Sequence, residues 1–577
     1  MIRRAEILIA PWDAMPVSSS DALARCLGRT LDNPKFLSRS CGPGQIIVIA
    51  YVGELDCENY NEQEELVLTE GHWPEPLGLQ LKIKSKCENP SWNLESDVYG
   101  VRPIYFGIDK RKRTVVSTRP EMVAALLGSR PSALSLAEQI LVGYTLENHT
   151  VFEDVFRLRP QRKLSYSKRD GCNLCDEPIA DCQPPDDPLS WTEDVKPIIT
   201  KAFEGDFALE LSGGVDSRLV LALGLNAGVK PRLVFTLGCD DDEDVQIARS
   251  ICKAQGINHF VLPVKFDKQQ IALDGFDFVR RSGFAVNASS YAWFPSAFNS
   301  LSSKRCGQIG GGGGECASGY YYSPIDHLGK VKKQDQLWVQ SRLFKSGVDL
   351  MQVFGQLRSE LLTSDVVDWA LRGLSQLEGT LRVRSDEFYL TQRVPNAGGP
   401  VLSASACWYL PLQPLLRSSH LKWTKSLSSE QRAGRKYQMQ IIYDLVPEIG
   451  TICYSHNRSY MTTPLSRLKQ GVRKVTTTAG KVKKRLAKHR SAPDQGASSV
   501  SKVLFEDKAI QQSILEFAVR DEICAQEDRI TQMFASPSRY SHELGVLLSA
   551  AWAAEELQSL SQELSSNARE VSTQCVA

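Results

Sequence analysis

The sequence predicts an α/β protein of several domains, in which an antiparallel β-sheet domain precedes a doubly wound parallel sheet with a helical C-terminal part. The chain has 577 residues, enough for roughly three or four domains that each bury a core. Short β-like runs separated by Gly, Pro and Asn dominate the first part, as in an antiparallel sheet. Further along, strands alternate with helices, which is typical of a parallel sheet.

The N-terminal domain is predicted over residues 1–180. Two of its β-like runs are rich in β-branched residues, and one alternates apolar residues with polar residues or glycine. These strands are expected at residues 45–52, 77–83 and 113–117. Helices are expected at residues 120–127 and 135–143. A polar, proline-rich stretch then predicts a linker over residues 181–195.

The second domain is predicted over residues 196–465, and its first half alternates strands with helices. Strands are expected at residues 207–211, 232–237 and 259–263, and helices at residues 217–225 and 244–255. Residues 340–450 have a mostly helical pattern. A further helical segment is predicted over residues 501–577.

The charge of the chain is nearly balanced, with 68 Lys and Arg residues against 67 Asp and Glu residues. This balance argues against a protein that is basic all over and coats nucleic acid. Residues 467–490 depart from it, because they contain ten Lys or Arg residues and no acidic residue. Residues 466–500 are therefore predicted to be a basic insertion. It is either a flexible linker or a docking arm for an acidic partner such as a leader peptide, a membrane surface or RNA.

The sequence has the features of a cytoplasmic enzyme. No stretch approaches the ~18 consecutive apolar residues of a membrane helix. The apolar run near the start is interrupted by Glu6 and stopped by Pro11, so it is too short for the core of a signal peptide. The fifteen cysteines are scattered and odd in number, which indicates free thiols. Cys172 and Cys175 have the spacing of a zinc knuckle, but no second ligand pair follows, so a polar hairpin is the preferred interpretation.

The string Ser-Gly-Gly-Val-Asp-Ser at positions 212–217 is the most informative feature of the sequence. It lies between a predicted strand and a predicted helix and lacks the lysine of the Walker loop. Its glycines let backbone amides approach an anion, towards which the following helix directs its positive end. Asp216 would repel a bare phosphate, so it suggests a magnesium ion that bridges carboxylate and phosphates. An ordinary strand-to-helix turn is the alternative, because these residues also occur in turns and helix caps.

This string resembles the pyrophosphate-binding loop of the ATP pyrophosphatases, and other segments narrow the resemblance to the asparagine synthetase family. Asp-Val-Tyr-Gly-Val-Arg-Pro-Ile-Tyr at 97–105 resembles the family's glutaminase-domain segment Asp-x-x-Gly-x-Arg-Pro-Leu-Tyr. Residues 116–121 and 150–160 are similar to other segments of that domain. Thr-Leu-Gly at 236–238, followed by Asp244, is similar to the segment that contacts adenosine.

The resemblance covers about residues 45–460 and implies a fold and an activity. It implies an N-terminal glutaminase-like β-sandwich of the Ntn type with helices, followed by an ATP pyrophosphatase domain. In the family, ATP adenylates a carboxylate with release of pyrophosphate, and an amine then attacks the acyl-adenylate to give an amide or lactam. The implied cofactors are ATP and Mg2+, and the implied partners are small-molecule or peptide carboxylates and amines.

The resemblance also implies which residues hold the nucleotide and act in catalysis. The implied nucleotide-binding residues are Ser212, Gly213, Gly214, Asp216, Ser217, Thr236, Leu237, Gly238 and Gly310. Asp216 would also bind the magnesium ion. Glu315 stands at the family's acid/base position, and Arg458 would supply the cation that faces the adenylate.

The first departure from the family pattern concerns glutamine. The family's glutaminase uses a cysteine directly after the initiator Met, with its free α-amino group as the base. Here Ile2 occupies that position and the first cysteine is Cys26. The sequence therefore argues against glutamine hydrolysis, as in the β-lactam synthetases and the lasso-peptide macrolactam synthetases, whose substrates carry their own amine.

The second departure lies in residues 310–320, which align without gaps with the family's Gly-Asp-Gly-x-Asp-Glu-Leu-Phe-Gly-Gly-Tyr. Glycine replaces both aspartates, at Gly311 and Gly314. The second aspartate is the family's other magnesium ligand, so the site would retain only Asp216. An acid from residues 240–244 is a candidate substitute, although such runs are more often solvated starts of helices.

The third departure is the family's catalytic lysine, which has no counterpart after Pro447. Arg458 is the only fixed cation in that stretch, and an arginine neutralises charge but does not readily move a proton. Lys436 is a second candidate, with a helix-surface charge as its alternative interpretation.

Three hypotheses follow from these patterns. The first is an ATP-dependent amide-forming ligase that is not fed by glutamine. The second is a catalytically degenerate relative that acts as a nucleotide-binding or assembly partner. The third, sulfur or adenylate transfer to RNA, is opposed by the glutaminase-like segments.

Overall fold

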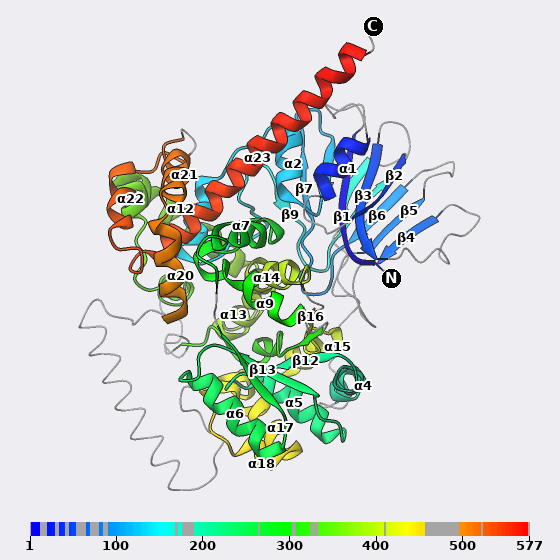
Figure 1. The fold of residues 1–577 in the computed structure, drawn as a ribbon, viewed down its shortest axis with the longest axis vertical. Coiled ribbons are helices and arrows are strands. Elements are labelled where there is room, and N and C mark those ends of the chain that lie inside the picture. The colour runs from blue at the N-terminus through cyan, green and yellow to red at the C-terminus, as the bar shows by residue number, and fades with distance from the viewer. Residues whose placement is uncertain are drawn as a thin grey trace.

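The structure is a computed structural model that describes most of the chain. The described residues are 2–11, 20–28, 34–40, 45–53, 65–69, 80–84, 91–167, 171–175, 190–263, 266–302, 307–323, 326, 333–408, 411–455, 495–520 and 523–574. They form an N-terminal pair of sheets, a helical middle part and a parallel-sheet domain (Figure 1).

Two antiparallel sheets make up the N-terminal domain. One has the order β2 (Lys35–Ser40), β3 (Gln45–Gly53), β1 (Ile2–Pro11), β8 (Thr114–Ser117), β7 (Tyr105–Ile108) and β9 (Phe156–Arg157). The other has the order β11 (Gly171–Cys175), β10 (Lys163–Ser167), β6 (Ser91–Glu95), β5 (Gln80–Lys84) and β4 (Glu65–Thr69). The sheets pack through a buried cluster in which Ile7 and Ile49 of the first sheet meet Trp92 and Leu164 of the second.

The predicted strands at 45–52 and 113–117 are β3 and β8. The prediction at 77–83 is confirmed only from Gln80, because residues 77–79 lie outside the described residues. β1 was not expected from the sequence, because its charged residues hide its apolar face. The charge of Glu6 is compensated inside the fold by Arg102 at 3.1 Å, so this strand is buried despite its composition.

Helices cover the outer face of the first sheet. They are α1 (Ser20–Gly28), α2 (Pro120–Leu127) and α3 (Ala133–Leu141). α2 begins with Pro120 in the first helical turn and ends at Gly128, whose φ of 68° is the left-handed conformation that closes many helices. The β10–β11 hairpin contains Cys172 and Cys175, which agrees with the hairpin interpretation of that segment.

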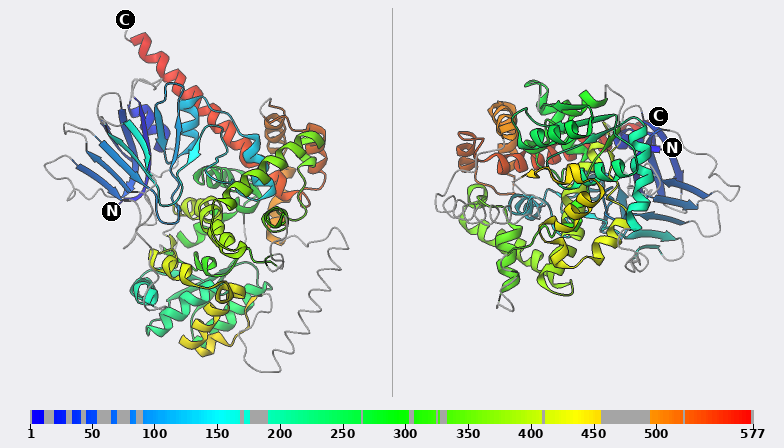
Figure 2. Two further views of the ribbon diagram at one scale, coloured as in Figure 1. Left: turned by 180° about the vertical axis from the view of Figure 1, so that it is seen from behind. Right: turned by 90° about the horizontal axis from the view of Figure 1, so that it is seen from below.

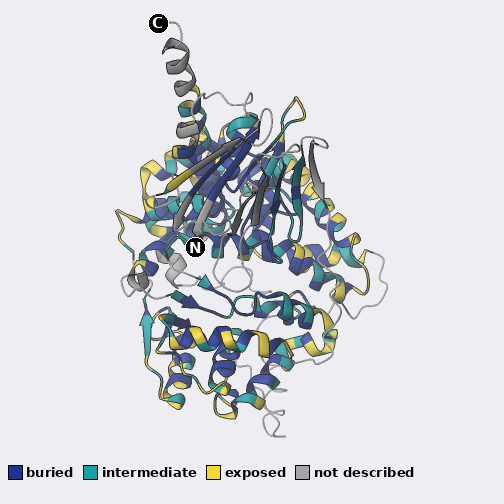
Figure 3. Ribbon diagram, turned by 90° about the vertical axis from the view of Figure 1, so that its right-hand side faces the viewer, coloured by how far each residue is buried: buried dark blue, intermediate teal, exposed yellow. Residues whose placement is uncertain are grey.

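The second domain is built on a parallel sheet with the strand order β14-β13-β12-β15-β16. Its strands are β12 (Phe207–Glu210), β13 (Leu233–Leu237), β14 (His259–Leu262), β15 (Gly307–Ile309) and β16 (Pro411–Leu412). The sheet is flanked by α4 (Ser190–Glu204), α5 (Asp216–Asn226), α6 (Glu243–Gln255), α17 (Lys436–Leu445) and α18 (Pro447–Gly450). These helices turn their exposed residues outward, while the strands between them are largely buried (Figure 3).

The remaining helices form the middle part and the C-terminal part. The middle helices are α7 (Ile271–Arg281), α8 (Ala288–Tyr291), α9 (Phe294–Ser302), α10 (Gln334–Trp338), α11 (Met351–Phe354), α12 (Gln356–Ser375), α13 (Leu381–Phe388), α14 (Gly399–Ser405), α15 (Ser418–Ser426) and α16 (Ser429–Arg432). Short π-helical segments occur at Val339–Leu343 and Tyr389–Gly398. The C-terminal helices are α20 (Gln495–Glu506), α21 (Lys508–Ala518), α22 (Glu527–Phe534) and α23 (Ser541–Gln574).

Two predicted boundaries are wrong by several residues. α4 begins at Ser190 and buries Trp191 and Val195 against the parallel sheet, so the predicted linker 181–195 extends too far. α20 begins at Gln495, so the predicted insertion 466–500 ends in a helix. The basic residues 467–490 lie outside the described residues.

The C-terminal helices do not form a separate unit. α23 runs from the helical part along the N-terminal domain and contacts α1, α2, α3, α7, α8 and α21 (Figures 1 and 2). Its apolar residues share one continuous core with the helices of both other parts. Among the described helices, none is both long and apolar enough to cross a lipid bilayer.

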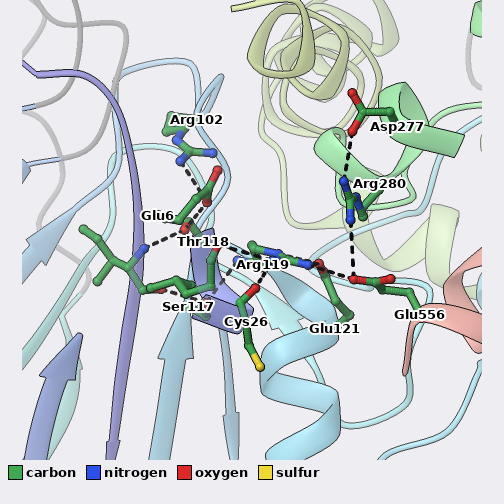
Figure 4. Close-up of polar contacts among 12 residues, drawn as sticks. Glu6, Cys26, Arg102, Ser117, Thr118, Arg119, Glu121, Asp277, Arg280 and Glu556 are labelled. Atoms are coloured by element: carbon green, nitrogen blue, oxygen red, sulfur yellow. Dashed lines mark hydrogen bonds and ion pairs between the residues drawn. The ribbon is translucent and has the colours of Figure 1, made fainter. Parts of the chain in front are cut away.

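A buried ion-pair network joins α2, α7 and α23 (Figure 4). Arg119 Nε donates to Glu121 Oε1 at 2.6 Å, and Arg119 Nη2 lies 3.2 Å from Glu556 Oε1. The same oxygen lies 3.8 Å from Arg280 Nη1, and Arg280 also pairs with Asp277 at 3.0 Å. Glu556 is 6% exposed and Arg119 is 3% exposed, so the network is shielded from water. The carboxylate of Glu556 therefore ties the last helix to both other parts of the chain.

We expect replacement of Glu556 by alanine to destabilise the protein, because two largely buried guanidinium groups lose the carboxylate they share. Breaking a buried ion pair on one side costs on the order of 3 kcal/mol. Scanning calorimetry should therefore show a thermal midpoint several degrees lower than in the wild type. Glu555→Ala is the matched control, because Glu555 is the exposed neighbour on the same helix. Equal midpoints for the two variants would contradict a structural role of the network.

Candidate active site at the carboxyl edge of the parallel sheet

Two loops meet where the strand order of the parallel sheet reverses. β12 pairs with β13 on one side and with β15 on the other, all in parallel. The loop at residues 212–217 follows β12, and the loop at residues 310–314 follows β15. In open α/β sheets, ligands bind at this reversal point, outside the carboxyl ends of the strands. The topology therefore places the two sequence motifs together at the position where a ligand is expected.

The glycines of the second loop are required by close packing. A Cβ atom at Gly311 would collide with the backbone of Asp216 and Ser217, and one at Gly314 would collide with the carboxyl group of Asp216. Gly313 has a φ of 95°, which a residue with a side chain rarely adopts. The glycine run is thus a close contact between two loops, and no aspartate fits at Gly311 or Gly314 in this arrangement.

The backbone of the first loop is held by its own side chains and by α6. Ser212 N donates to Ser217 Oγ at 3.1 Å, and Gly214 N donates to Ser212 Oγ at 3.2 Å. Gly213 N donates to Asp244 Oδ1 at 3.1 Å. Loop amides that precede a helix are natural donors to a phosphate. At the amide of Gly213, the Asp244 carboxylate occupies the position that such an anion would take.

Arg218 supports the loop from inside the domain. Its side chain is fully buried, and its guanidinium group stacks on the ring of Tyr454 at 3.7 Å. It donates to the carbonyl groups of Ile449, Ile452 and Cys453 at 2.7–3.1 Å. The residues that follow α18 are thereby fixed against the start of α5, and Ser455 N also donates to the carbonyl of Gly213 at 2.9 Å.

Asp216, the first residue of α5, is paired with a cation of the chain itself. Arg435 forms an ion pair with Asp216 Oδ2. Gln438 Nε2 donates to Asp216 Oδ1 at 3.2 Å and to the carbonyl of Gly314 at 2.9 Å. Arg435 precedes α17 with a φ of 61°, a left-handed conformation that is costly for a residue with a side chain. The strained turn holds the guanidinium group at the carboxylate.

The residues present do not fit a magnesium ion at Asp216. Both oxygens of Asp216 already accept hydrogen bonds, one of them from a guanidinium group that would repel a second cation. Gly311 and Gly314 supply no ligand. Within the described residues, no group of three or more His, Cys, Asp or Glu side chains could hold a metal ion. The positive charge at this carboxylate comes from Arg435.

Glu315 lies at the start of the short 3₁₀ helix Gly314–Ala317, next to this ion pair. Burial raises the pKa of its carboxyl group to about 7, and the neighbouring Asp216 acts in the same direction. Arg435 and Arg393 act in the opposite direction. A carboxyl group with a pKa near neutrality can both donate and accept a proton close to pH 7.

The predicted adenosine-contacting residues lie on the adjacent strand. Thr236 is buried, and its hydroxyl donates to the carbonyl of Leu211 at 2.6 Å and lies 2.9 Å from His259 Nε2. Leu237 ends β13, and Gly238 follows with a φ of 141° that brings Asp242 close to its Cα. Gly310 N bonds to the carbonyl of Leu412, so this residue is part of the sheet edge.

Comparison with known families supports the assignment that the geometry suggests. Residues 204–434 match the family model for asparagine synthase. These residues form an asparagine synthase domain. The match contains all five strands of the parallel sheet, both loops and the middle helices. The chain matches no curated protein.

The asparagine synthase domain brings most of the predicted site residues together. The loop residues, Asp216 and Glu315 meet at one edge of the sheet, whereas Arg458 lies outside the described residues. Lys436 is exposed at the start of α17, which agrees with a surface charge. Sequence analysis missed the adjacent Arg435, because the cation could be recognised only by its contact with Asp216.

Asp244 and Gln438 also contribute in ways that the sequence did not reveal. The acidic run at residues 240–244 was expected to supply a magnesium ligand or a solvated start of a helix. Asp240, Asp241 and Asp242 are exposed before α6, whereas Asp244 turns inward to the loop. The distinction depends on the position of α6 beside the loop, which the local sequence does not encode.

Removal of the Asp244 charge should strengthen anion binding at the loop. The carboxylate competes with a phosphate for the amide of Gly213, so we expect Asp244→Asn to bind ATP several-fold more tightly in calorimetry. Asp241→Asn is the control, because it removes the same charge from an exposed neighbour. An equal gain in both variants would show a long-range charge effect instead of competition at the amide.

The protonation of Glu315 should make stability depend on pH. The carboxyl group of Glu315 has a pKa of about 7 in the folded chain and about 4.5 when exposed. The folded state therefore binds an extra proton between these values, and its stabilising contribution is lost as the pH rises through 7. Glu315→Gln should match the wild type at pH 5 and have the higher thermal midpoint at pH 8. For Glu204→Gln, an exposed control, the difference in thermal midpoint from the wild type should be the same at pH 5 and pH 8.

Proposed function

We propose that the chain is an ATP-dependent amide-forming ligase. It adenylates a carboxylate with release of pyrophosphate, and an amine then displaces AMP from the acyl-adenylate to form the amide. The observation that carries this proposal is the meeting of the 212–217 loop with Asp216, Arg435 and Glu315 at the reversal point of the parallel sheet. The family match supports the class of reaction. The loop supports pyrophosphate as the leaving group, because its amides can bind it.

Each part of the site suits one requirement of adenylation. The loop amides and the positive end of α5 can bind the leaving pyrophosphate. Arg435 can supply positive charge beside the transferred phosphate, in the role that preorganised cations have in phosphoryl and adenylyl transfer. Glu315, with a pKa near 7, can take the proton that the attacking amine loses. None of these steps requires a metal ion bound to Asp216.

We infer that the N-terminal domain serves as a scaffold and does not hydrolyse glutamine. Cys26 is buried in α1 and lies 3.2 Å from Glu563 Oε1, so it is not an exposed nucleophile. Its carbonyl accepts a hydrogen bond from Arg119, which places it within the ion-pair network of α2 and α23. The proposed ligase therefore takes its amine from the substrate or from free ammonia.

The alternative is a catalytically degenerate relative that acts as a nucleotide-binding or assembly partner. The glycines at 311 and 314 and the pairing of Asp216 with Arg435 motivate it. Calorimetry that detects no ATP binding would exclude the proposed ligase, and ATP binding without pyrophosphate exchange would favour the degenerate relative.

Exchange of labelled pyrophosphate into ATP tests the reaction, since it reports reversible adenylation without the amine. We expect the wild-type chain to catalyse exchange when given a panel of amino acids and aromatic acids, and Arg435→Gln to lose it by at least about a hundredfold, because this variant removes the cation beside the transferred phosphate. Arg232→Gln, which changes an exposed arginine, should retain full exchange. Exchange that survives in Arg435→Gln would refute the assignment of the site.

A further inference from the structure

Arg393 lies in an enclosure of tyrosines beside the proposed ligase site. It belongs to the π-helical segment Tyr389–Gly398, a conformation that often marks functional positions. Its guanidinium carbon lies 4.7 Å from the ring centre of Tyr320 and 5.7 Å from that of Tyr144. Tyr320 follows Glu315 in the chain by five residues, so the enclosure is continuous with the loop that carries the acid/base residue.

Four tyrosines, Tyr144, Tyr320, Tyr321 and Tyr389, form the walls of this enclosure. The hydroxyl groups of Tyr144 and Tyr321 are 2.6 Å apart. The ring of Tyr320 lies 4.9 Å from that of Tyr389 and 5.1 Å from that of Tyr321. Three of the tyrosines are buried, whereas Tyr320 is 40% exposed. Tyr320 is therefore the wall of the enclosure that is accessible from solvent.

The enclosure carries positive charge without a matching carboxylate. Among the described residues, Arg393 forms no ion pair with an acid, and its neighbours are tyrosines. Lys345 is close enough for Arg393 to influence it, and burial together with Arg393 lowers the pKa of Lys345 to about 8. The surrounding tyrosines favour the charged guanidinium group and raise the pKa of Arg393. A guanidinium group that has no carboxylate partner among the described residues is suited to bind an anionic ligand.

We propose that Arg393 binds the carboxylate of an aromatic acid whose ring packs against Tyr320. Guanidinium groups bind carboxylates through two parallel hydrogen bonds, and the exposed tyrosine face offers a stacking surface. This inference rests on the proposed function, because it identifies the acid that the ligase takes. Glu315 and Arg393 lie near enough to influence each other electrostatically, so an acid held here lies beside the reacting groups.

The proposal is tested by measuring the binding of benzoate to the full chain with saturation-transfer NMR in the absence of nucleotide. Benzamide is the neutral probe of the same shape. We expect the wild type to bind benzoate and to bind benzamide more weakly. Arg393→Gln should weaken benzoate binding about tenfold, as for the loss of a hydrogen-bonded charge, with little effect on benzamide. Arg393→Lys should retain part of the affinity, because it keeps the charge but loses the planar fork.

Two further variants separate the roles of the ring and of general charge. Tyr320→Leu should weaken benzoate and benzamide binding by a similar factor, because both probes lose the stacking surface. Arg372→Gln is the matched control, since Arg372 also stacks on an aromatic ring, that of Trp369, at 4.6 Å but outside the enclosure. It should bind benzoate as the wild type does.

The proposal is overturned if the wild type binds no benzoate, if it binds benzamide equally well, or if Arg393→Gln binds benzoate unchanged. A thermal midpoint equal to that of the wild type would verify that Arg393→Gln is folded. Calorimetry with ATP distinguishes this failure from failure of the proposed function. If the protein binds ATP but not benzoate, only the proposal of an aromatic acid is refuted. If it binds benzoate but not ATP, the proposed binding at Arg393 stands and the proposed ligase function is refuted.

Discussion

The ion pair between Asp216 and Arg435 is the interaction around which the candidate site is organised. Asp216 is the first residue of the helix that follows the anion-binding loop, so its charge lies beside the proposed position of the phosphates. Arg435 neutralises that charge from a strained turn before α17. Gln438 links the same carboxylate to the carbonyl of Gly314 and so joins the loops after β12 and β15. The site is thus assembled around one carboxylate that has two partners, Arg435 and Gln438.

This arrangement also explains the glycine-rich second loop. An aspartate at Gly314 would collide with Asp216 and bring a second negative charge to a single guanidinium group. The loss of aspartates in the second loop and the pairing of Asp216 with Arg435 are therefore physically coupled. A site that carries its own fixed cation has less need of a metal ion, and the raised pKa of Glu315 reduces the negative charge that remains to be balanced.

The packing of the whole chain supports this site from a distance. The N-terminal sheets, the middle helices and α23 share one apolar core, and a buried network through Arg119 and Glu556 fixes their relative positions. The middle part holds Arg393 and Tyr389 in the π-helical segment Tyr389–Gly398, and Tyr144 of the N-terminal domain packs against the same guanidinium group. By packing against the middle helices, the N-terminal domain helps to hold them in place.

The sequence by itself determined the first three strands of the parallel sheet, the two helices between them and the position of the 212–217 loop after the first strand. These are local properties, since hydrophobic period and glycine content are sufficient to recognise them. It did not reveal β1, whose buried Glu6 is paired with a residue about a hundred positions away. Only the tertiary structure decided which charges meet. Arg435 and Asp244 are ordinary surface-type residues in the sequence, and they acquire a role because folding brings them to Asp216 and Gly213 from elements distant in the chain.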